Sequence, residues 1–267
     1  MGRLSARLKE IKDSGVKSLV AYIVAGDPLP KTTVPLMHDM AAAGGDVFEL
    51  GMPFSDPEAE GPVIQRAHER ALKHKISLLD ILEMVREFRQ TDTETPVILM
   101  GYLNPIETMG YKAFAQVSAH AGVDGTIIVN LPPEEAVELS VDLDANDIEM
   151  VYLLAPTTTD ERAKMICEAS QGFVYYVSLK GTTGAATLDT ADVAEKMARF
   201  RDFSQLPVMV GFGIKDGPSA RAVADLSDGA VVGSAIVNII DENKDDPVQI
   251  RKRVKAFILE LRSALDA

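Results

Sequence analysis

The largely apolar run Ser18-Leu-Val-Ala-Tyr-Ile-Val24, followed directly by Ala25-Gly26-Asp27-Pro28, bears most directly on the fold class. The run does not alternate between apolar and polar residues, which is typical of a parallel strand buried on both faces. A doubly wound nucleotide-binding sheet would carry a GxGxxG turn after its first strand, and this tetrapeptide lacks that pattern. The stretch therefore favours a closed parallel barrel, with the doubly wound open sheet as the alternative.

The same rhythm of a short apolar run, a turn of small residues and a longer amphipathic segment continues along the chain. We predict strands at 18–24, 46–50, 96–101, 125–129, 149–154, 173–178, 207–211 and 229–232, with helices of 3.6-residue periodicity between them. Amphipathic segments at 1–13 and 248–265 predict an extra helix before the first strand and a long closing helix. Eight βα units within 267 residues indicate an α/β fold, a single-domain (β/α)₈ TIM barrel over residues 1–267 with an extra N-terminal helix.

Composition and charge exclude several classes of function. Lys plus Arg total 27 against 40 Asp plus Glu, a net charge of -13 without a basic run, so we expect neither nucleic-acid binding nor attraction to anionic membranes. No apolar stretch reaches the length of a membrane span, and 1–17 lacks the apolar core of a secretory signal, so we expect a cytoplasmic protein. The single Cys167 excludes an intrachain disulfide and a CxxC site, and the four histidines lack HxxxH or HxH spacing, so we expect no metal.

Glu49 is the first candidate for chemistry, because it lies near the end of the second predicted strand. Active residues of such a barrel lie at the C-terminal ends of the strands. Alternation places Glu49 on the face of Val47, with Phe48 and Leu50 on the other face. We therefore expect a partly desolvated carboxylate with a pKa raised toward the range of general acid–base catalysis. A solvated acid at the strand end is the alternative.

The loop after this strand is rich in acids and holds Asp56, Glu58 and Glu60. A carboxylate of this loop that faces Glu49 would complete an acid–base pair. We interpret Glu58 as a charge on a solvated loop, whereas Glu60 fits either the solvated loop or the pair.

Glycines follow three consecutive predicted strands, in Gly181-Thr-Thr-Gly184, Gly211-Phe-Gly213 and Gly233-Ser234. Backbone N–H groups at such positions can approach one anion together, and the helix opened by Gly233-Ser234 adds its positive end. Barrels place phosphate sites after strands seven and eight, so the pattern predicts a phosphate-bearing small-molecule substrate. Side chains at strand ends that could wall a flat apolar ligand are Tyr22, Tyr102, Ile127, Tyr175 and Phe212. The histidines fall in or beside helical stretches, which favours surface or packing roles for them.

The strip Phe48-Glu-Leu-Gly-Met-Pro-Phe-Ser-Asp-Pro57 closely resembles the tryptophan synthase alpha chain family. Further similar segments, in the family's order and spacing, are Gly101-Tyr-Leu-Asn-Pro105, Leu131-Pro-Pro-Glu-Glu135, Leu154-Ala-Pro-Thr-Thr158, Tyr176-Val-Ser-Leu-Lys-Gly181 and Gly211-Phe-Gly-Ile214. The resemblance extends from Arg3 to about Leu261.

The resemblance implies retro-aldol cleavage of indole-3-glycerol phosphate to indole and glyceraldehyde 3-phosphate, by a carbon–carbon lyase that is the alpha subunit of tryptophan synthase in L-tryptophan biosynthesis. It implies Glu49 as the acid and base at the glycerol hydroxyl and the indole carbon, Glu60 as the group facing the positive charge on the indole nitrogen, and Tyr175 as a catalytic-site residue beside the glycerol chain. Residues implied to bind the substrate are Tyr22, Met100, Tyr102, Ile127, Val129, Leu153, Thr183, Gly184, Phe212, Gly213, Gly233 and Ser234. It also implies no metal or organic cofactor on this chain, and an αββα complex with a beta chain that carries pyridoxal phosphate.

The chain departs from the family pattern at four positions. Glu60 and Asn130 stand where Asp is usual, Glu58 stands where an apolar residue is usual, and Thr182 stands where Val or Ile is usual. An extra methylene moves the Glu60 carboxylate by roughly 1 Å, and a misplacement of that size can cost about 100-fold in rate. Three alternatives therefore stay open: a free-standing lyase that releases indole, a binding protein that activates a beta chain while Glu60 blunts catalysis, and another phosphate-binding barrel lyase or isomerase.

Overall fold

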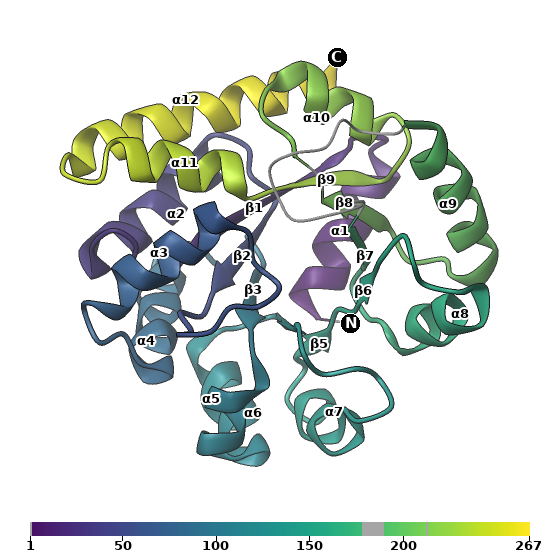
Figure 1. Ribbon diagram of the computed structural model, residues 1–267, viewed down its shortest axis with the longest axis horizontal. Helices are drawn as coiled ribbons and strands as arrows, with labels where there is room; N and C mark the ends of the chain where they lie inside the picture. The colour runs from purple at the N-terminus through teal and green to yellow at the C-terminus, as the bar shows by residue number, and fades with distance from the viewer. Residues whose placement is uncertain (1, 178–189, 212) are drawn as a thin grey trace.

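A ring of parallel strands surrounded by helices forms the body of the molecule (Figure 1). The computed structural model describes residues 2–177, 190–211 and 213–267. The strands are β1 (Ser18–Val24), β2 (Val47–Gly51), β3 (Val97–Gly101), β4 (Gly125–Ile128), β5 (Glu149–Met150), β6 (Leu153–Leu154), β7 (Val174–Val177), β8 (Val208–Gly211) and β9 (Gly229–Val232). They follow one another in the order β5-β4-β3-β2-β1-β9-β8-β7-β6, and every pair is parallel.

The predicted fifth strand, 149–154, is present as the two short strands β5 and β6, and it closes the ring. β5 pairs with β4, whereas β6 pairs with β7 on the other side. The two residues between them continue this pairing, since Val151 N donates to Thr126 O at 3.0 Å and Tyr175 N donates to Tyr152 O at 3.2 Å. The other seven predicted strands end within one residue of the observed ones. The predicted eight-unit barrel is therefore confirmed.

Helices cover the outside of the ring, and α1 precedes β1 as predicted. They are α1 (Arg3–Asp13), α2 (Thr33–Ala42), α3 (Pro62–Leu72), α4 (Leu78–Arg89), α5 (Leu103–Met109), α6 (Tyr111–Ala121), α7 (Val137–Asp144), α8 (Asp160–Ala169), α9 (Thr190–Phe203), α10 (Gly217–Ala224), α11 (Ser234–Glu242) and α12 (Pro247–Asp266), with a short 3₁₀ turn at Pro30–Thr32. Within the described ranges, none of these helices is long and apolar enough to cross a membrane.

Helices α3, α5 and α6 lie between predicted strands, and the sequence does not predict their bounds separately. The inner face of α3 buries Ile64, Ala67, His68 and Ala71. Gly110, with φ at 86°, ends the short helix α5 and precedes α6.

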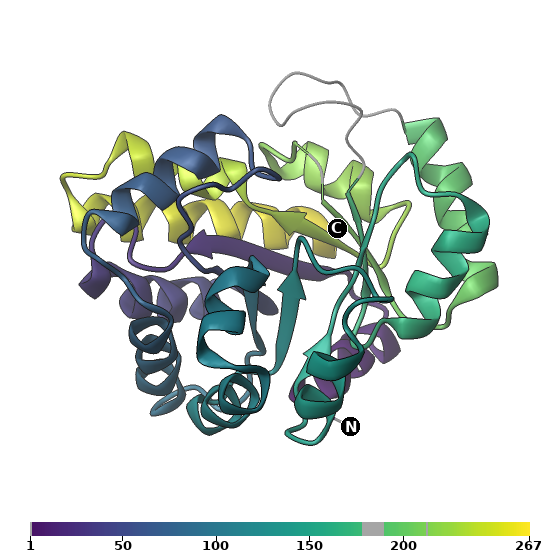
Figure 2. The same ribbon diagram turned by 60° about the horizontal axis from the view of Figure 1, so that its bottom comes forward.

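Helix α1 closes the end of the barrel where the strands begin (Figure 2). Its Leu4 and Leu8 are buried within the cluster that fills the barrel interior. The other members of that cluster come from the strands or from residues next to them: Val20, Val47, Ile98, Ile127, Val151, Phe173, Met209 and Val231. The interior is therefore packed at this end, which leaves the C-terminal ends of the strands for a site.

Candidate active site

Glu49 lies inside the barrel near the end of β2. Val47 of the same strand belongs to the interior cluster, whereas Phe48 and Leu50 pack outward in the cluster between strands and helices, as the alternation predicts. The Glu49 residue is only 1% exposed, and its Oε1 has no hydrogen-bond partner among the described residues. Burial first, and the charge of Glu60 second, raise the pKa of Glu49 to about 8.

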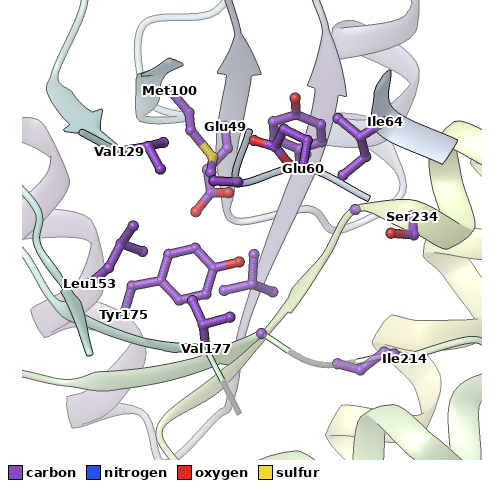
Figure 3. A pocket seen from close by; sticks show the side chains of 16 residues that line it. Glu49, Glu60, Ile64, Met100, Val129, Leu153, Tyr175, Val177, Ile214 and Ser234 are labelled. Carbon is purple, nitrogen blue, oxygen red and sulfur yellow. The ribbon is translucent and has the colours of Figure 1, made fainter. Parts of the chain in front are cut away.

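Glu60 approaches the same cavity from the loop between β2 and α3 (Figure 3). A turn holds its backbone, because Glu60 N donates to Pro57 O at 3.0 Å and Gln65 Nε2 donates to Glu60 O at 2.8 Å. Burial raises the pKa of Glu60 to about 7. Glu58 of the same loop is exposed, as expected for a solvated charge. The structure therefore brings together the strand carboxylate and one loop carboxylate.

The two carboxylates line a cavity of about 190 Å³ at the C-terminal end of the barrel. The predicted site residues that line it are Tyr22, Glu49, Glu60, Met100, Val129, Leu153, Tyr175, Gly213, Gly233 and Ser234. Gly211 of the predicted glycine pattern also lines the cavity, as do residues that the sequence does not single out: Ala59, Ile64, Val177, Ile214 and Val231. Their signal in the sequence is weak, because small and aliphatic residues near strand ends have no chemistry that separates them from core residues.

The cavity has an apolar side and a side that can bind an anion. Figure 3 shows Met100, Val129 and Leu153 on one side, and Ser234 on the other. On the Ser234 side, Gly233 caps the N-terminus of α11. A Cβ built on Gly213 would meet no atom of the described residues within 4 Å, so the exposed backbone there can face a ligand. Backbone N–H groups and a helix N-terminus beside open space can bind a phosphate.

Tyr175 projects from β7 into the cavity near Glu49 (Figure 3). Its ring lies against Gly211 of β8, where a Cβ would come within 2.4 Å of the Tyr175 hydroxyl. Burial first, and the charges of Glu49 and Glu60 next, raise the pKa of Tyr175 well above its usual value. The phenol therefore stays neutral and can donate a hydrogen bond.

Two predicted binding residues lie next to the cavity without lining it. Tyr102 stacks on Phe54 with ring centroids 4.9 Å apart, and its hydroxyl accepts a hydrogen bond from Ala59 N at 2.9 Å, so it supports the loop that carries Glu60. Ile127 belongs to the packed interior cluster. The predicted residues Thr183, Gly184 and Phe212 lie outside the described residues, as does Thr182.

His68, on the buried face of α3, has a more specific environment than a packing role requires. It is 2% exposed, its Nδ1 lies 3.0 Å from Phe54 N, and its Nε2 lies 3.3 Å from the Tyr22 hydroxyl. Burial lowers the pKa of His68 to about 4, so the ring is neutral near pH 7. Its one signal in the sequence is its place in the segment that follows the acidic loop.

Within the part of the chain that the structure describes, no group of three or more His, Cys, Asp or Glu is arranged to hold a metal ion. Cys167 is a buried free thiol whose pKa is raised by burial to about 11. A buried thiol with a raised pKa is unreactive.

Comparison with known proteins agrees with the resemblance seen in the sequence. The family model for the tryptophan synthase alpha chain matches residues 8–266. The tryptophan synthase alpha chain of Thioalkalivibrio sulfidiphilus is 54% identical over 100% of both chains, and that of Marinobacter nauticus is 53% identical over 100% of this chain and 99% of the relative.

Solved structures lead to the same family. The tryptophan synthase alpha chain of Legionella pneumophila has a TM-score of 0.91 at 48% identity, covering 100% of this chain and 98% of that one. A chain of tryptophan synthase from M. tuberculosis has a TM-score of 0.88 at 30% identity, covering 99% of this chain and 100% of that one. The chain therefore belongs to the tryptophan synthase alpha chain family, and it is a lyase subunit of tryptophan biosynthesis.

Proposed function

We propose that this chain cleaves indole-3-glycerol phosphate into indole and glyceraldehyde 3-phosphate in the cavity that Glu49 and Glu60 line. One observation carries the proposal: a buried and a partly buried carboxylate, both with raised pKa values, lie between an apolar wall and the N-terminus of a helix. Acid–base chemistry on a substrate with a flat ring at one end and a phosphate at the other needs this combination.

The two ends of the substrate match the two sides of the cavity. We assign the indole ring to the side of Met100, Val129 and Leu153, and the phosphate to the backbone of Gly213 and the N-terminus of α11. The glycerol chain then spans the middle, where the Glu49 carboxylate and the Tyr175 hydroxyl are directed.

The protonation states of the two carboxylates suit the reaction. Near pH 7, Glu49 keeps its proton because its pKa is about 8, and Glu60 is the first of the pair to ionise because its pKa is about 7. The two groups interact, so they titrate as a pair with one proton held mainly on Glu49. The site thus holds a proton donor and an anion together.

The bond between the indole ring and the glycerol chain then breaks in balanced steps. Glu49 gives its proton to the indole carbon that carries the chain, and the Glu60 carboxylate stabilises the positive charge that develops on the ring nitrogen. The Glu49 carboxylate takes the proton of the adjacent glycerol hydroxyl, and the carbon–carbon bond breaks. Its electron pair restores the aromatic ring while the hydroxyl carbon becomes an aldehyde. Glu49 ends the cycle protonated, as it began.

In this proposal the chain needs no organic cofactor of its own and works in the cytoplasm. It forms an αββα heterotetramer with a beta chain that carries pyridoxal phosphate. Membership of the family supports the partner, and a structure of tryptophan synthase from M. tuberculosis in its aminoacrylate-bound form is among those similar to this chain. Light scattering of the purified chain mixed with a beta chain tests the assembly. A mass of two chains of each kind is expected, and separate species would contradict it.

The lyase reaction itself is tested by incubating the purified chain with indole-3-glycerol phosphate in D₂O. We expect indole and glyceraldehyde 3-phosphate in equal amounts, with deuterium at the indole carbon that carried the chain, because Glu49 exchanges its proton with solvent before delivering it. Aldehyde formation without indole, or no turnover with or without a beta chain, would contradict the proposal.

A further inference from the structure

His68 is a buried titratable side chain that the proposed reaction does not use, and it joins two walls of the cavity. It lies on α3, and its two ring nitrogens contact different elements: Phe54 in the loop after β2, and Tyr22 on β1. The inference drawn from these contacts rests on the proposed function of the cavity.

The contact with the loop decides which ring nitrogen carries the hydrogen. Phe54 N is a backbone N–H donor, so Nδ1, 3.0 Å away, must accept. A neutral imidazole that accepts at Nδ1 carries its hydrogen at Nε2. The Nε2–H group therefore donates to the Tyr22 hydroxyl oxygen at 3.3 Å.

This bond directs the hydrogen of the Tyr22 hydroxyl. Because the oxygen accepts from His68, the O–H hydrogen must point elsewhere, and the Tyr22 side chain borders the cavity. Tyr22 is paired in register with Glu49, and its ring crosses Gly51, where a Cβ would lie 2.4 Å from the Tyr22 hydroxyl. Of the charges that act on the Tyr22 hydroxyl, that of Glu60 is the largest. The O–H hydrogen is therefore attracted toward the negative charge of Glu60 in the same cavity.

We propose that His68 is a positioning residue that fixes the Tyr22 hydroxyl as a donor directed at the carboxylate pair, and so keeps the negative charge on Glu60 and the proton on Glu49. The effect is a charge–dipole interaction that stabilises the anion nearer to the hydroxyl. It supports the protonation state from which the proposed reaction starts.

Two substitutions of His68 by an amide side chain each keep one of its two hydrogen bonds and remove the other. In His68→Asn the amide lies near the position of Nδ1 and can accept from Phe54, but it does not reach Tyr22. In His68→Gln the amide lies near the position of Nε2 and can donate to Tyr22, but it does not replace the acceptor for Phe54. Tyr22→Phe removes the dipole and leaves His68 in place.

The first test uses only the wild-type chain, without a substrate, so it does not depend on whether a variant folds. Long-range ¹H–¹⁵N correlation NMR of the wild-type, ligand-free chain at pH 7 reports the tautomer of each histidine. We expect the slowly exchanging, buried ring of His68 to be neutral with its hydrogen on Nε2. A hydrogen on Nδ1, or a charged ring at pH 7, would overturn the proposal.

The second test titrates the Glu60 carboxyl by ¹³C NMR, with the resonance assigned by its absence in Glu60→Gln. We expect Tyr22→Phe and His68→Asn each to raise the pKa of Glu60 by about half to one pH unit, and His68→Gln to restore it. A role limited to packing would not separate Asn from Gln in this way. The same pKa in wild type and Tyr22→Phe overturns the proposal.

Lyase activity is a separate readout. The acid limb of the kcat/KM profile is expected to move to higher pH in His68→Asn and to stay in place in His68→Gln. If the NMR titrations give the expected pattern while the wild-type chain releases no indole, the role of His68 stands and the proposed reaction fails.

Discussion

At the scale of single residues, Glu49 is in an environment that favours catalysis over stability. Its carboxyl group is almost fully buried, and one oxygen has no hydrogen-bond partner among the described residues. A buried polar atom without a partner typically costs about 1–3 kcal/mol. The same burial raises the pKa to about 8, which keeps a proton available near neutral pH.

This environment predicts how stability changes with pH. The pKa of Glu49 is about 8 in the folded chain against an ordinary value of 4.5, so between these pH values the unfolded chain releases a proton that the folded chain keeps. The free energy of unfolding therefore falls as pH rises through this window. Glu49→Gln is expected to remove that fall and to be more stable than wild type at pH 8, by on the order of a few kcal/mol.

Urea unfolding at pH 5 and pH 8 checks this prediction, with the exposed Glu58→Gln as the matched control in the same region. The gain from Glu49→Gln should shrink toward pH 5. A gain of equal size at both pH values would show that the Glu49 carboxyl has an ordinary pKa.

The pair also predicts the pH dependence of the reaction. The reactive form carries one proton, so kcat/KM should fall below about pH 7, where Glu60 is protonated, and above about pH 8, where Glu49 loses its proton. These limbs belong to the coupled pair rather than to either residue. Steady-state kinetics from pH 5.5 to 9.5 measure them. The Glu58→Gln variant should give the same bell, and a rate that keeps rising above pH 9 would contradict the assignment.

At the scale of elements, two glycines at the end of β8 have different roles that one methyl group can separate. A Cβ on Gly213, at the proposed phosphate site, would meet no other described residue within 4 Å, whereas a Cβ on Gly211 would lie 2.4 Å from the Tyr175 hydroxyl. We expect Gly213→Ala to raise KM roughly 10- to 100-fold by blocking one charge-assisted hydrogen bond to phosphate, with a smaller change in kcat. Gly211→Ala should instead lower kcat by displacing Tyr175.

Michaelis–Menten analysis of the two variants, with circular dichroism to check folding, distinguishes these effects. Equal KM values for Gly213→Ala and wild type would show that the phosphate does not bind at this loop.

The elements also show how far the sequence determines the site. The first strand is predicted to the residue, and the face of Glu49 follows from simple alternation, because both depend on local patterns. Alternation also places Ile127 on the inward face of its strand, but its side chain packs in the interior cluster and does not line the cavity. The position of Tyr102 under the acidic loop depends on its contacts with Phe54 and Ala59, which are distant in sequence.

The role of His68 is hard to predict from the sequence for a related reason. It depends on a backbone donor from one element and a hydroxyl from another. The spacing of apolar residues within one segment does not indicate contacts between segments that are distant in the sequence.

At the scale of the whole molecule, the two ends of the barrel have separate tasks. Helix α1 seals one end: Leu4 and Leu8 fill the interior, and Arg3 and Arg7 form ion pairs with Asp124 and Asp46. The cavity lies at the other end, between the loops that follow the strands. This is the usual division of a (β/α)₈ barrel, with stability at the N-terminal end of the strands and chemistry at the C-terminal end.

The division predicts that a defect under α1 lowers stability without changing the reaction. Leu8→Ala leaves a cavity in the packed interior and should cost about 2–5 kcal/mol of unfolding free energy. KM and kcat at 25 °C should stay within about twofold of wild type, because the chemistry is at the opposite end. The exposed Lys9→Ala on the same helix is the control. A large loss of kcat in folded Leu8→Ala would show that the two ends are coupled.

The central claim is that Glu49 moves the proton and that Glu60 works as the second carboxylate. Single-turnover indole release from indole-3-glycerol phosphate by wild type, Glu49→Gln and Glu60→Asp, each with and without a beta chain, tests it most directly. We predict an active wild type, a loss of about 10²- to 10⁴-fold in Glu49→Gln, and activity within about 100-fold of wild type in Glu60→Asp. An inactive wild type that Glu60→Asp restores, or a Glu49→Gln variant as fast as wild type, would contradict the account.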